Sequence, residues 1–115
     1  RNSGVKVGIL TNGPSKLQRS VISSLGFEEL VDAVVISEEA GFRKPQTDIF
    51  SLILKELGVD DNQSVMVGDS LETDIEGALA AGVHSVAFRL ASIPKGVPSC
   101  KTMTEVMNVL QSILN

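Results

Sequence analysis

The sequence predicts an α/β fold in which a parallel sheet carries helices on both faces. Short apolar runs typical of strands alternate with amphipathic segments of helical period, in the order strand then helix, four times along the chain. The runs are apolar throughout, which is typical of strands buried on both faces. With 115 residues and 43% hydrophobic content, the chain fits a single globular domain over residues 1–115.

Each expected element has its own local signal. We expect strands at residues 5–10, 33–37, 64–68 and 84–89, and helices from about Ser15 to the residue before Gly26 and at about 45–57, 72–81 and 103–114. Ser15 and Gln18 fit the S-x-x-Q capping box that opens a helix. The predicted apolar stripe of the first helix is Leu17, Val21, Ile22 and Leu25, and that of the last is Met103, Val106, Met107, Leu110, Ile113 and Leu114.

Composition excludes several classes of function. A formal net charge of −4 argues against nucleic acids and anionic membranes as partners. No apolar run approaches the roughly 20 residues of a membrane span, and no signal peptide is visible. The single cysteine, Cys100, cannot form an internal disulfide, so we expect a reducing compartment such as the cytoplasm, and a buried, inert thiol.

Polar residues follow the first expected strand at Thr11-Asn12-Gly13. Ligands of open parallel sheets bind outside the carboxyl ends of the strands. Thr11 offers a hydroxyl, Gly13 allows main-chain N–H groups to approach an anion, and the helix near Ser15 adds a partial positive end. The alternative interpretation is an ordinary turn followed by a helix cap.

A second candidate is Lys44, which precedes Pro45 at the expected start of a helix. The helix dipole repels a cation in that position, so its placement suggests that an anion compensates. A solvated surface lysine is the alternative. Glu38, Glu39 and Arg43 flank this loop, where we expect them to be solvated or to line the entrance of a pocket.

The third candidate is the acidic stretch Asp69, Glu72 and Asp74, which begins directly after a buried strand. Carboxylates at a helix N-terminus are favoured by the dipole, and this accounts for Glu72 and Asp74 without any ligand. Asp69 lies at the mouth of the strand, where Mg²⁺ is commonly held by one or two carboxylates, waters and a substrate phosphate. Together, Thr11, Lys44 and Asp69 would supply a hydroxyl, a cation and a metal carboxylate around one phosphoryl group.

These motifs resemble those of the haloacid dehalogenase superfamily, whose members are mostly phosphatases with a three-layer, Rossmann-like core. "ILTNG" resembles its second motif, which implies phosphate binding by Thr11, the Asn12 backbone and Gly13. "GFRKPQTDIF" resembles the third, with Lys44 binding phosphate and steadying a nucleophile. "VMVGDSLETDIEGALAAG" resembles the fourth, in which Asp69 and Asp74 form the Mg²⁺ site.

The first motif of that family, a strand ending in Asp-x-Asp, is absent, and so is the cap domain that follows it. Asp60 and Asp61 precede a strand and cannot replace the motif. The resemblance therefore implies the C-terminal portion of a phosphatase core, without the attacking carboxylate and with weak or no Mg²⁺ binding of its own. The missing strand lies centrally in the family's sheet, so we expect strands one and three to close up, an upstream segment to fill the slot, or a second copy to do so.

The function we expect is Mg²⁺-dependent hydrolysis of a small phosphorylated metabolite by the intact protein. A non-catalytic phosphate-binding or scaffold domain on the same fold is the alternative, because the nucleophile is missing. A phosphoacceptor receiver domain is disfavoured because it requires an acidic pair and a phosphorylatable aspartate before its threonine and lysine. The sequence leaves the substrate and the oligomeric state open.

Overall fold

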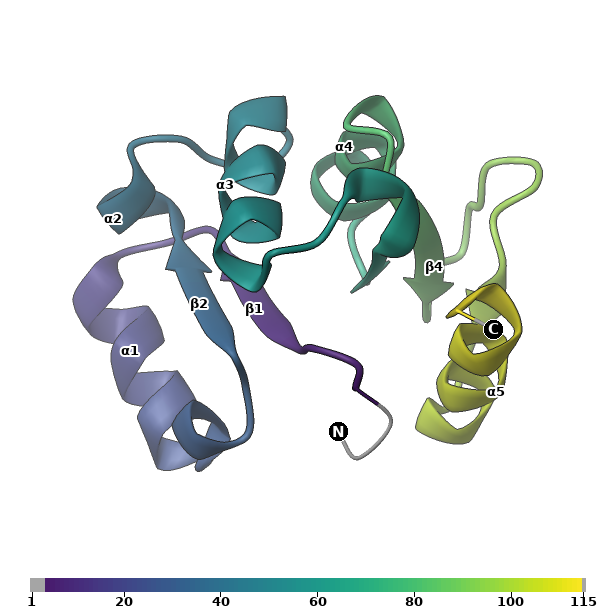
Figure 1. The fold of residues 1–115 in the computed structure, drawn as a ribbon. Coiled ribbons are helices and arrows are strands. Elements are labelled where there is room, and N and C mark those ends of the chain that lie inside the picture. The colour runs from purple at the N-terminus through teal and green to yellow at the C-terminus, as the bar shows by residue number, and fades with distance from the viewer. Residues whose placement is uncertain (1–3, 115) are drawn as a thin grey trace. The chain divides into compact units, whose positions relative to one another are not determined.

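The computed structural model describes residues 4–114, although it leaves the side chain of Leu114 undescribed. The chain divides into two compact units, Arg1–Gly58 (unit 1) and Val59–Asn115 (unit 2), and each is described by itself. Figure 1 shows their elements. The expectation of one domain over residues 1–115 stays a prediction.

Unit 1 contains two parallel strands and the helices that follow them. Its elements are β1 (Gly8–Thr11), α1 (Ser15–Ser24), the 3-10 turn η1 (Phe27–Glu29), β2 (Ala33–Ile36), α2 (Ser37–Ala40) and α3 (Thr47–Leu57). The strands pair in register from Gly8 opposite Ala33 to Thr11 opposite Ile36. In Figure 1, α1 runs alongside β2.

Helix α3 covers β1 and β2 through its apolar face. Ile49, Phe50 and Ile53 are all buried, and they recur at the spacing of one helical face. The packing on β1 is so close that a Cβ on Gly8 would lie 2.9 Å from Cδ1 of Ile53. A Cβ there would force the end of the Ile53 side chain to shift, so glycine allows this close packing.

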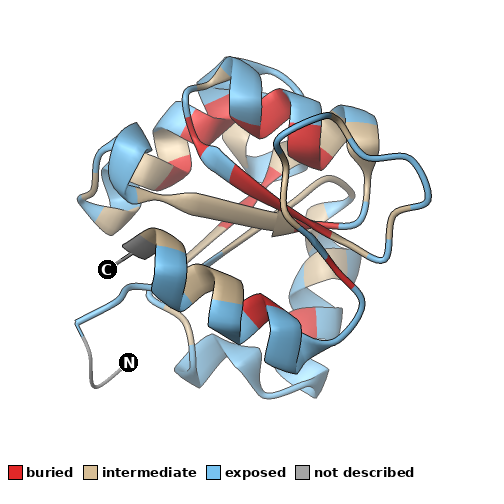
Figure 2. Ribbon diagram, turned by 90° about the vertical axis from the view of Figure 1, so that its right-hand side faces the viewer, coloured by how far each residue is buried: buried red, intermediate tan, exposed pale blue. Residues whose placement is uncertain are grey.

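Unit 2 contains three parallel strands in the order β3-β4-β5. Its elements are the 3-10 turn η2 (Asp61–Gln63), β3 (Val65–Gly68), the π-helix η3 (Leu71–Glu76), α4 (Gly77–Ala80), β4 (His84–Phe88), β5 (Ser99–Cys100) and α5 (Met103–Leu114). Figures 1 and 2 place α5 on one side of β4 and α4 on the other.

The two faces of this sheet follow from the strand period of two residues. On one face Val86 and Cys100 are buried against Val106 of α5, with Val65, Val67 and Phe88 packed around them. On the other face the Ser85 hydroxyl donates a hydrogen bond to the Ile75 carbonyl in η3, at 3.3 Å. The predicted coverage of a sheet by helices on both faces is therefore confirmed in unit 2.

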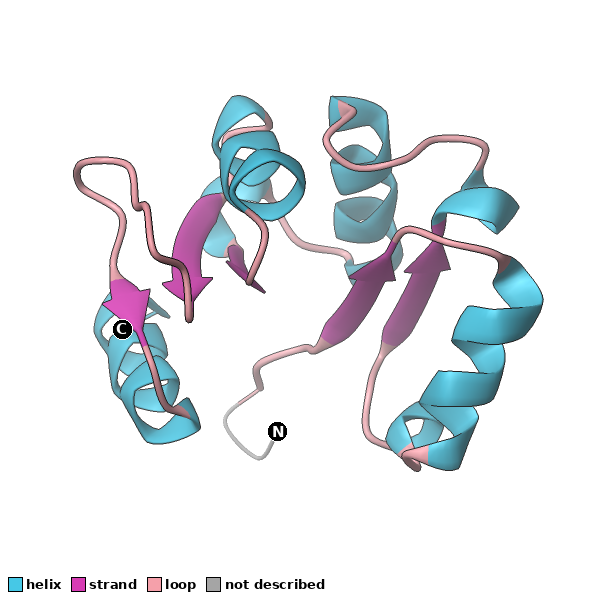
Figure 3. Ribbon diagram, turned by 180° about the vertical axis from the view of Figure 1, so that it is seen from behind, coloured by secondary structure: helices cyan, strands magenta, loops and turns pink. Residues whose placement is uncertain are grey.

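The α/β class with parallel strands is confirmed (Figure 3). The described strands form two sheets rather than the single sheet that the pattern predicts. Within the described residues, β1 is hydrogen-bonded to β2 alone and β3 to β4 alone. Each sheet therefore ends in an edge strand, at β1 in unit 1 and at β3 in unit 2.

Several expected boundaries are wrong by a few residues. Strand β1 starts at Gly8 instead of Val5, because the partner strand begins only at Ala33. Just before that point the Asp32 carboxylate accepts a hydrogen bond from the Val7 N–H, at 2.8 Å. Helix α3 starts at Thr47, three residues after Lys44, so Lys44 lies before the helix and not in its first turn.

The predicted capping box of Ser15 and Gln18 is also wrong. The cap residue is Pro14, which has no side-chain donor or acceptor, and Ser15 is the first residue of α1. A reciprocal pair is found instead before α5, where Glu105 N–H donates to Thr102 Oγ1 and Glu105 Oε1 accepts from Thr102 N–H.

The predicted apolar stripes are only partly buried. Of the α1 set, Ile22 is buried while Leu17, Val21 and Leu25 are exposed. In α5, Val106 is buried, Met103 and Met107 are exposed, and the Leu114 side chain lies outside the described residues. Helical period gives the direction of a face but not how much of it the neighbouring strands can cover.

Two smaller expectations concern Cys100 and the membrane. Cys100 is buried, as expected, and its burial raises the pKa of the thiol. It lies in β5, a two-residue strand too short for the sequence pattern to reveal. His84 opens β4 and is exposed. No helix among residues 4–114 has the length and apolar character needed to cross a membrane.

Packing of α5 on the sheet generates a stability prediction. We expect Val106→Ala to lower the free energy of unfolding by about 2 kcal/mol, because two buried methyl groups are removed from a close-packed cluster. Urea denaturation of the 115-residue chain measures the change. The control is Met107→Ala on the same helix, at a residue that is 56% exposed. Equal losses from both substitutions would contradict the assignment of the buried face.

Candidate functional site

The turn at the end of β1 carries the first group of candidate residues. Thr11 ends the strand and is half-buried with Asn12 and Gly13. Gly13 has a φ of 141°, a conformation that residues with a Cβ rarely adopt. The Gln18 side chain donates to the Asn12 carbonyl at 3.3 Å, which ties the turn back to α1. Glycine thus lets the chain reverse sharply between β1 and α1.

The Asn12 side chain connects this turn to the loop that contains Lys44. Asn12 Oδ1 accepts a hydrogen bond from the Lys44 N–H at 2.9 Å, and Asn12 Nδ2 donates to the Lys44 carbonyl at 3.0 Å. The two residues are 32 positions apart in the sequence. Two of the three predicted groups therefore lie together in unit 1, joined by a two-point contact.

Lys44 is only 8% exposed. This rules out the alternative of a solvated surface lysine. Its loop is also shaped by Gln46, whose side-chain oxygen accepts from the Arg43 N–H at 2.8 Å while its own N–H donates to the Arg43 carbonyl. A long cationic side chain held in a buried position needs an anionic or polar environment there.

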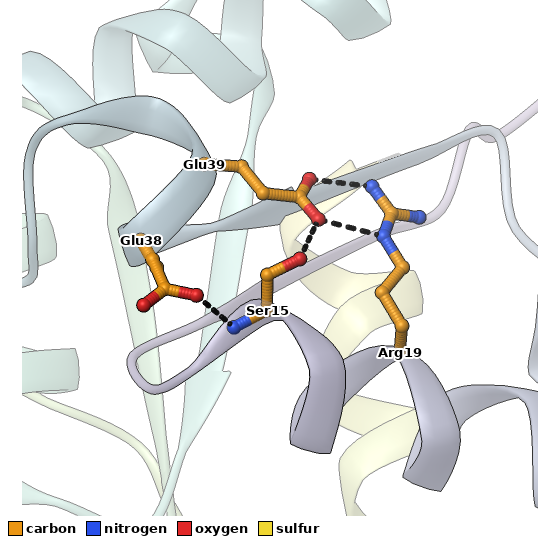
Figure 4. Close-up of polar contacts among 4 residues, drawn as sticks. All are labelled: Ser15, Arg19, Glu38 and Glu39. Carbon is orange, nitrogen blue, oxygen red and sulfur yellow. Dashed lines mark hydrogen bonds and ion pairs between the residues drawn. The ribbon is translucent and has the colours of Figure 1, made fainter.

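Helix α2 contacts the N-terminus of α1 through side chains (Figure 4). Ser37 Oγ accepts a hydrogen bond from the Gly13 N–H at 2.9 Å, and Glu38 Oε1 accepts from the Ser15 N–H at 2.7 Å. From the sequence we expected these main-chain donors, and the helix end beside them, to face a bound anion. In the structure the Gly13 and Ser15 N–H groups are already used by the protein, so any phosphate at this turn must rely on other groups.

Glu39 holds the same helix end by its carboxylate. It accepts from Arg19 Nε at 2.9 Å and from Arg19 Nη2 at 2.6 Å, and also from the Ser15 hydroxyl. The hydrogen bonds from Arg19 and then Ser15 lower the pKa of Glu39 to about 2. Glu38 and Glu39 are exposed, as predicted, but they organise the turn instead of lining a pocket.

The acidic stretch of unit 2 is built around the Asp74 carboxylate. Asp74 is 5% exposed, and its Oδ2 accepts hydrogen bonds from the N–H groups of Asp69 and Ser70, at 3.2 and 3.3 Å. A Cβ on Gly68 would collide with the Asp74 side chain. Glycine at the end of β3 therefore makes room for a carboxylate that folds back onto the turn.

The helix expected at residues 72–81 is a π-helix, η3, followed by the short α4. Its start is widened because the Ser70 carbonyl accepts from both the Asp74 N–H and the Ile75 N–H, each at 3.1 Å. Short π-helical turns are rare and occur frequently at functional sites. In this protein the widened turn occurs where the Asp74 carboxylate folds back onto the main chain at the end of β3.

Asp69 presents the carboxylate best suited to a metal ion. It directly follows β3 and is exposed, and within residues 4–114 its side chain forms no hydrogen bond or ion pair. Asp74 differs, since its carboxylate already binds two main-chain donors. No group of three or more His, Cys, Asp or Glu residues in the described part of the chain is placed to hold a metal. Asp69 thus fits as one carboxylate of a Mg²⁺ site, and its role as a ligand stays a prediction.

The structure brings Thr11, Asn12, Gly13 and Lys44 together in unit 1, and Asp69 and Asp74 together in unit 2. The meeting of both sets at one phosphate stays a prediction. Sequence reasoning missed Ser37 and the linking role of the Asn12 side chain. Neither leaves a local signal, because each acts on main-chain groups more than 20 positions away.

Parallel strands followed by helices, with small polar turns and acidic residues at the carboxyl ends of the strands, define the chain as an α/β protein. Residues 1–82 match the haloacid dehalogenase-like hydrolase family, and the chain belongs to that family. The resemblance seen in the motifs is thereby confirmed.

Relatives and solved structures agree with this membership. The chain is 41% identical over 88 residues to ribulose-1,5-bisphosphate 5-phosphatase of Halopiger xanaduensis, which covers 76% of this chain and 37% of that protein. It is 36% identical over 116 residues to human N-acylneuraminate-9-phosphatase, covering 95% and 47% respectively. The structure superposes on a phosphatase from Thermococcus onnurineus with a TM-score of 0.86 and 32% identity, over 96% of this chain and 52% of that one. The chain thus spans less than half the length of these two curated relatives.

The contacts of Asp74 generate a second prediction. We expect Asp74→Asn to lower the free energy of unfolding by about 1–3 kcal/mol, because a buried charged acceptor of two N–H groups is replaced. Urea denaturation provides the measurement. Glu72→Gln, an exposed acid in the same helix, is the control and should change stability by no more than about 0.5 kcal/mol. Indistinguishable results for the two variants would count against the proposed role of Asp74 in the turn.

The Arg19–Glu39 contact generates a third prediction. In Arg19→Ala the pKa of Glu39 should rise from about 2 toward 4.5, as followed by the carboxyl carbon-13 shift during an acid titration. A pKa lowered in the folded state stabilises the fold above the unfolded pKa, so this contribution is lost as the pH falls from about 4.5 to 2. Arg43→Ala is the control and should leave Glu39 unchanged. A Glu39 pKa that stays near 2 in Arg19→Ala would show that Arg19 does not cause the lowered pKa.

Proposed function

We propose that the intact protein containing this chain is a phosphatase that hydrolyses a small phosphorylated metabolite with Mg²⁺. The observation that carries the proposal is the two-point contact of Asn12 with Lys44, which joins two of the family's motifs at the carboxyl end of β1. The relatives named above are phosphatases of small phosphorylated compounds by their names. Buried Cys100 suits a reducing compartment, and we propose the cytoplasm.

In this proposal the phosphate is bound by the residues of unit 1. The Thr11 hydroxyl donates to a phosphate oxygen, supported by the Asn12 main chain, while Gly13 gives the turn its shape. The buried ammonium of Lys44 neutralises charge on the phosphoryl oxygens and steadies the nucleophile. The Gly13 N–H has a partner in Ser37, so Thr11 and Lys44 carry most of the recognition.

Asp69 is proposed as the Mg²⁺ ligand, with Asp74 holding the Asp69–Ser70 main chain in place. When bound, Mg²⁺ would neutralise charge on the phosphate oxygens. Because one available carboxylate makes a poor Mg²⁺ site, we expect this chain alone to bind the ion weakly or not at all. Lys44 and Asp69 are the catalytic residues that the chain contributes, from its two units.

The nucleophile must come from outside this chain. The 115 residues contain no strand ending in Asp-x-Asp, so we propose that the chain by itself does not form the phospho-enzyme. The edge strands β1 and β3 each leave room for a further strand in their own sheets, and an upstream segment or a second copy would supply it. An Asp-x-Asp strand in the upstream segment would supply both the missing backbone partners and the attacking carboxylate.

A non-catalytic phosphate-binding or scaffold domain is the second candidate. It is favoured by the lack of any cluster of three metal-ligating side chains within residues 4–114. Titration of inorganic phosphate and of Mg²⁺ into the 115-residue chain separates weak binding from none. Retention of phosphate binding without activity in the intact protein would favour this candidate.

The test of the enzymatic proposal uses the intact protein with its upstream segment. We expect hydrolysis of p-nitrophenyl phosphate with Mg²⁺, and a fall of about 100-fold or more in kcat for Asp69→Asn, because a metal ligand is lost. Glu72→Gln is the control, since that exposed carboxylate has no assigned role. Activity unaffected by Asp69→Asn would sink the proposal.

A further inference from the structure

We propose that the Asn12 carboxamide is a positioning group that sets the place of Lys44 relative to Thr11, and so adjusts the anion site to a phosphate. This inference rests on the proposed function. The family resemblance assigns phosphate binding to the Asn12 main chain, whereas the contacts of its side chain point to a separate role.

The geometry is that of a side-chain amide paired with a main-chain peptide. Asn12 contributes one acceptor and one donor, and Lys44 contributes one donor and one carbonyl, at 2.9 and 3.0 Å. Two hydrogen bonds to the same residue fix both position and orientation, whereas one would leave the Lys44 main chain free to rotate about the contact. Few other side chains offer a donor and an acceptor in this arrangement.

The contact crosses between segments that nothing else in the local sequence would hold in register. Thr11 is covalently adjacent to Asn12, so its hydroxyl is placed by β1. The Lys44 loop lies between α2 and α3 and belongs to neither helix. The Asn12 pairing therefore fixes the Lys44 main chain relative to the end of β1. Without it, a small movement of the loop would displace the end of the long Lys44 side chain much further.

The main chain around Asn12 is itself held by two further hydrogen bonds. The Gly13 N–H donates to Ser37 Oγ at 2.9 Å, and the Asn12 carbonyl accepts from Gln18 Nε2 at 3.3 Å. These bonds immobilise the main chain around Asn12, so its amide cannot follow the loop if the loop moves. Lys44, at 8% exposure, has little free space in which to compensate.

Hydrogen exchange gives the first measurement, on the 115-residue chain. In Asn12→Ala the main-chain amide of Lys44 should exchange at least about tenfold faster, because it loses its acceptor. The matched control is Asn62→Ala, because Asn62 donates to Asp61 Oδ1 through its main-chain N–H and not through its side chain. Unchanged Lys44 exchange in Asn12→Ala would overturn the inference.

Phosphate affinity gives the second measurement, by titration of inorganic phosphate followed by amide NMR shifts. Asn12→Ala should raise the Kd about tenfold, and Asn62→Ala should leave it unchanged. If Asn12 acts through Lys44, then adding Asn12→Ala to Lys44→Met should raise the Kd little further than Lys44→Met alone. Fully additive effects would show that Asn12 acts on phosphate independently of Lys44, and would overturn the proposal.

The isosteric variant Asn12→Asp adds a pH profile that general destabilisation would not produce. The ionised carboxylate accepts from the Lys44 N–H but faces the Lys44 carbonyl without a donor. When protonated it can again accept and donate, so its phosphate affinity relative to the parent chain should recover as the pH falls from 7 toward about 4. A ratio independent of pH would contradict the two-point pairing.

The results also separate this inference from the function on which it rests. Failure of the parent chain to bind phosphate would count against the proposed anion site, and with it against the inference. Normal phosphate binding by the parent chain, combined with unchanged Lys44 exchange in Asn12→Ala, would overturn the positioning role alone.

Discussion

Main-chain polar groups at the carboxyl ends of parallel strands must find partners once the ladder of the sheet stops, and this constraint organises both units. Where β1 ends, Ser37 and Glu38 accept from the N–H groups of Gly13 and Ser15. Where β3 ends, the Asp74 carboxylate accepts from Asp69 and Ser70. Each turn is therefore held by side chains from the element that follows it or packs on it, because unpaired buried donors would be costly.

Such pairing decides which groups remain for a ligand. At the first turn the Gly13 and Ser15 N–H groups donate to Ser37 and Glu38, so these two donors are not open to a ligand. At the second turn the Asp74 carboxylate binds the main chain, whereas Asp69 and Glu72 are exposed. The turns are rigid for the same reason, since every bond that removes a donor from the ligand also fixes the main chain beside it. A rigid frame with few free polar groups suits recognition of a small, highly charged anion.

Much of the fold could be read from local pattern. Helix α5 has the predicted bounds, β2, β3 and β4 lie within the expected runs and β1 overlaps its run, because apolar runs and helical period report on the type of element directly. The errors occur at the ends of elements. The Ser15 capping box failed because a residue of α2 offered Ser15 a better partner, and the helix after β3 was widened because Asp74 turned back to the strand end. In both cases a contact made by tertiary structure prevailed over a local preference.

By itself the sequence determined the α/β class, the order of the elements and the family, because these depend on hydrophobic period and on motifs of adjacent residues. It also placed Thr11, Lys44 and Asp69 after strands or before a helix, where a phosphate site of this class is expected. Only the tertiary structure decided that Lys44 is buried, that Asn12 holds its main chain and that Asp74 binds the turn instead of standing free. These depend on hydrogen bonds whose partners are chosen by the packing of distant segments, and no local pattern records such a choice.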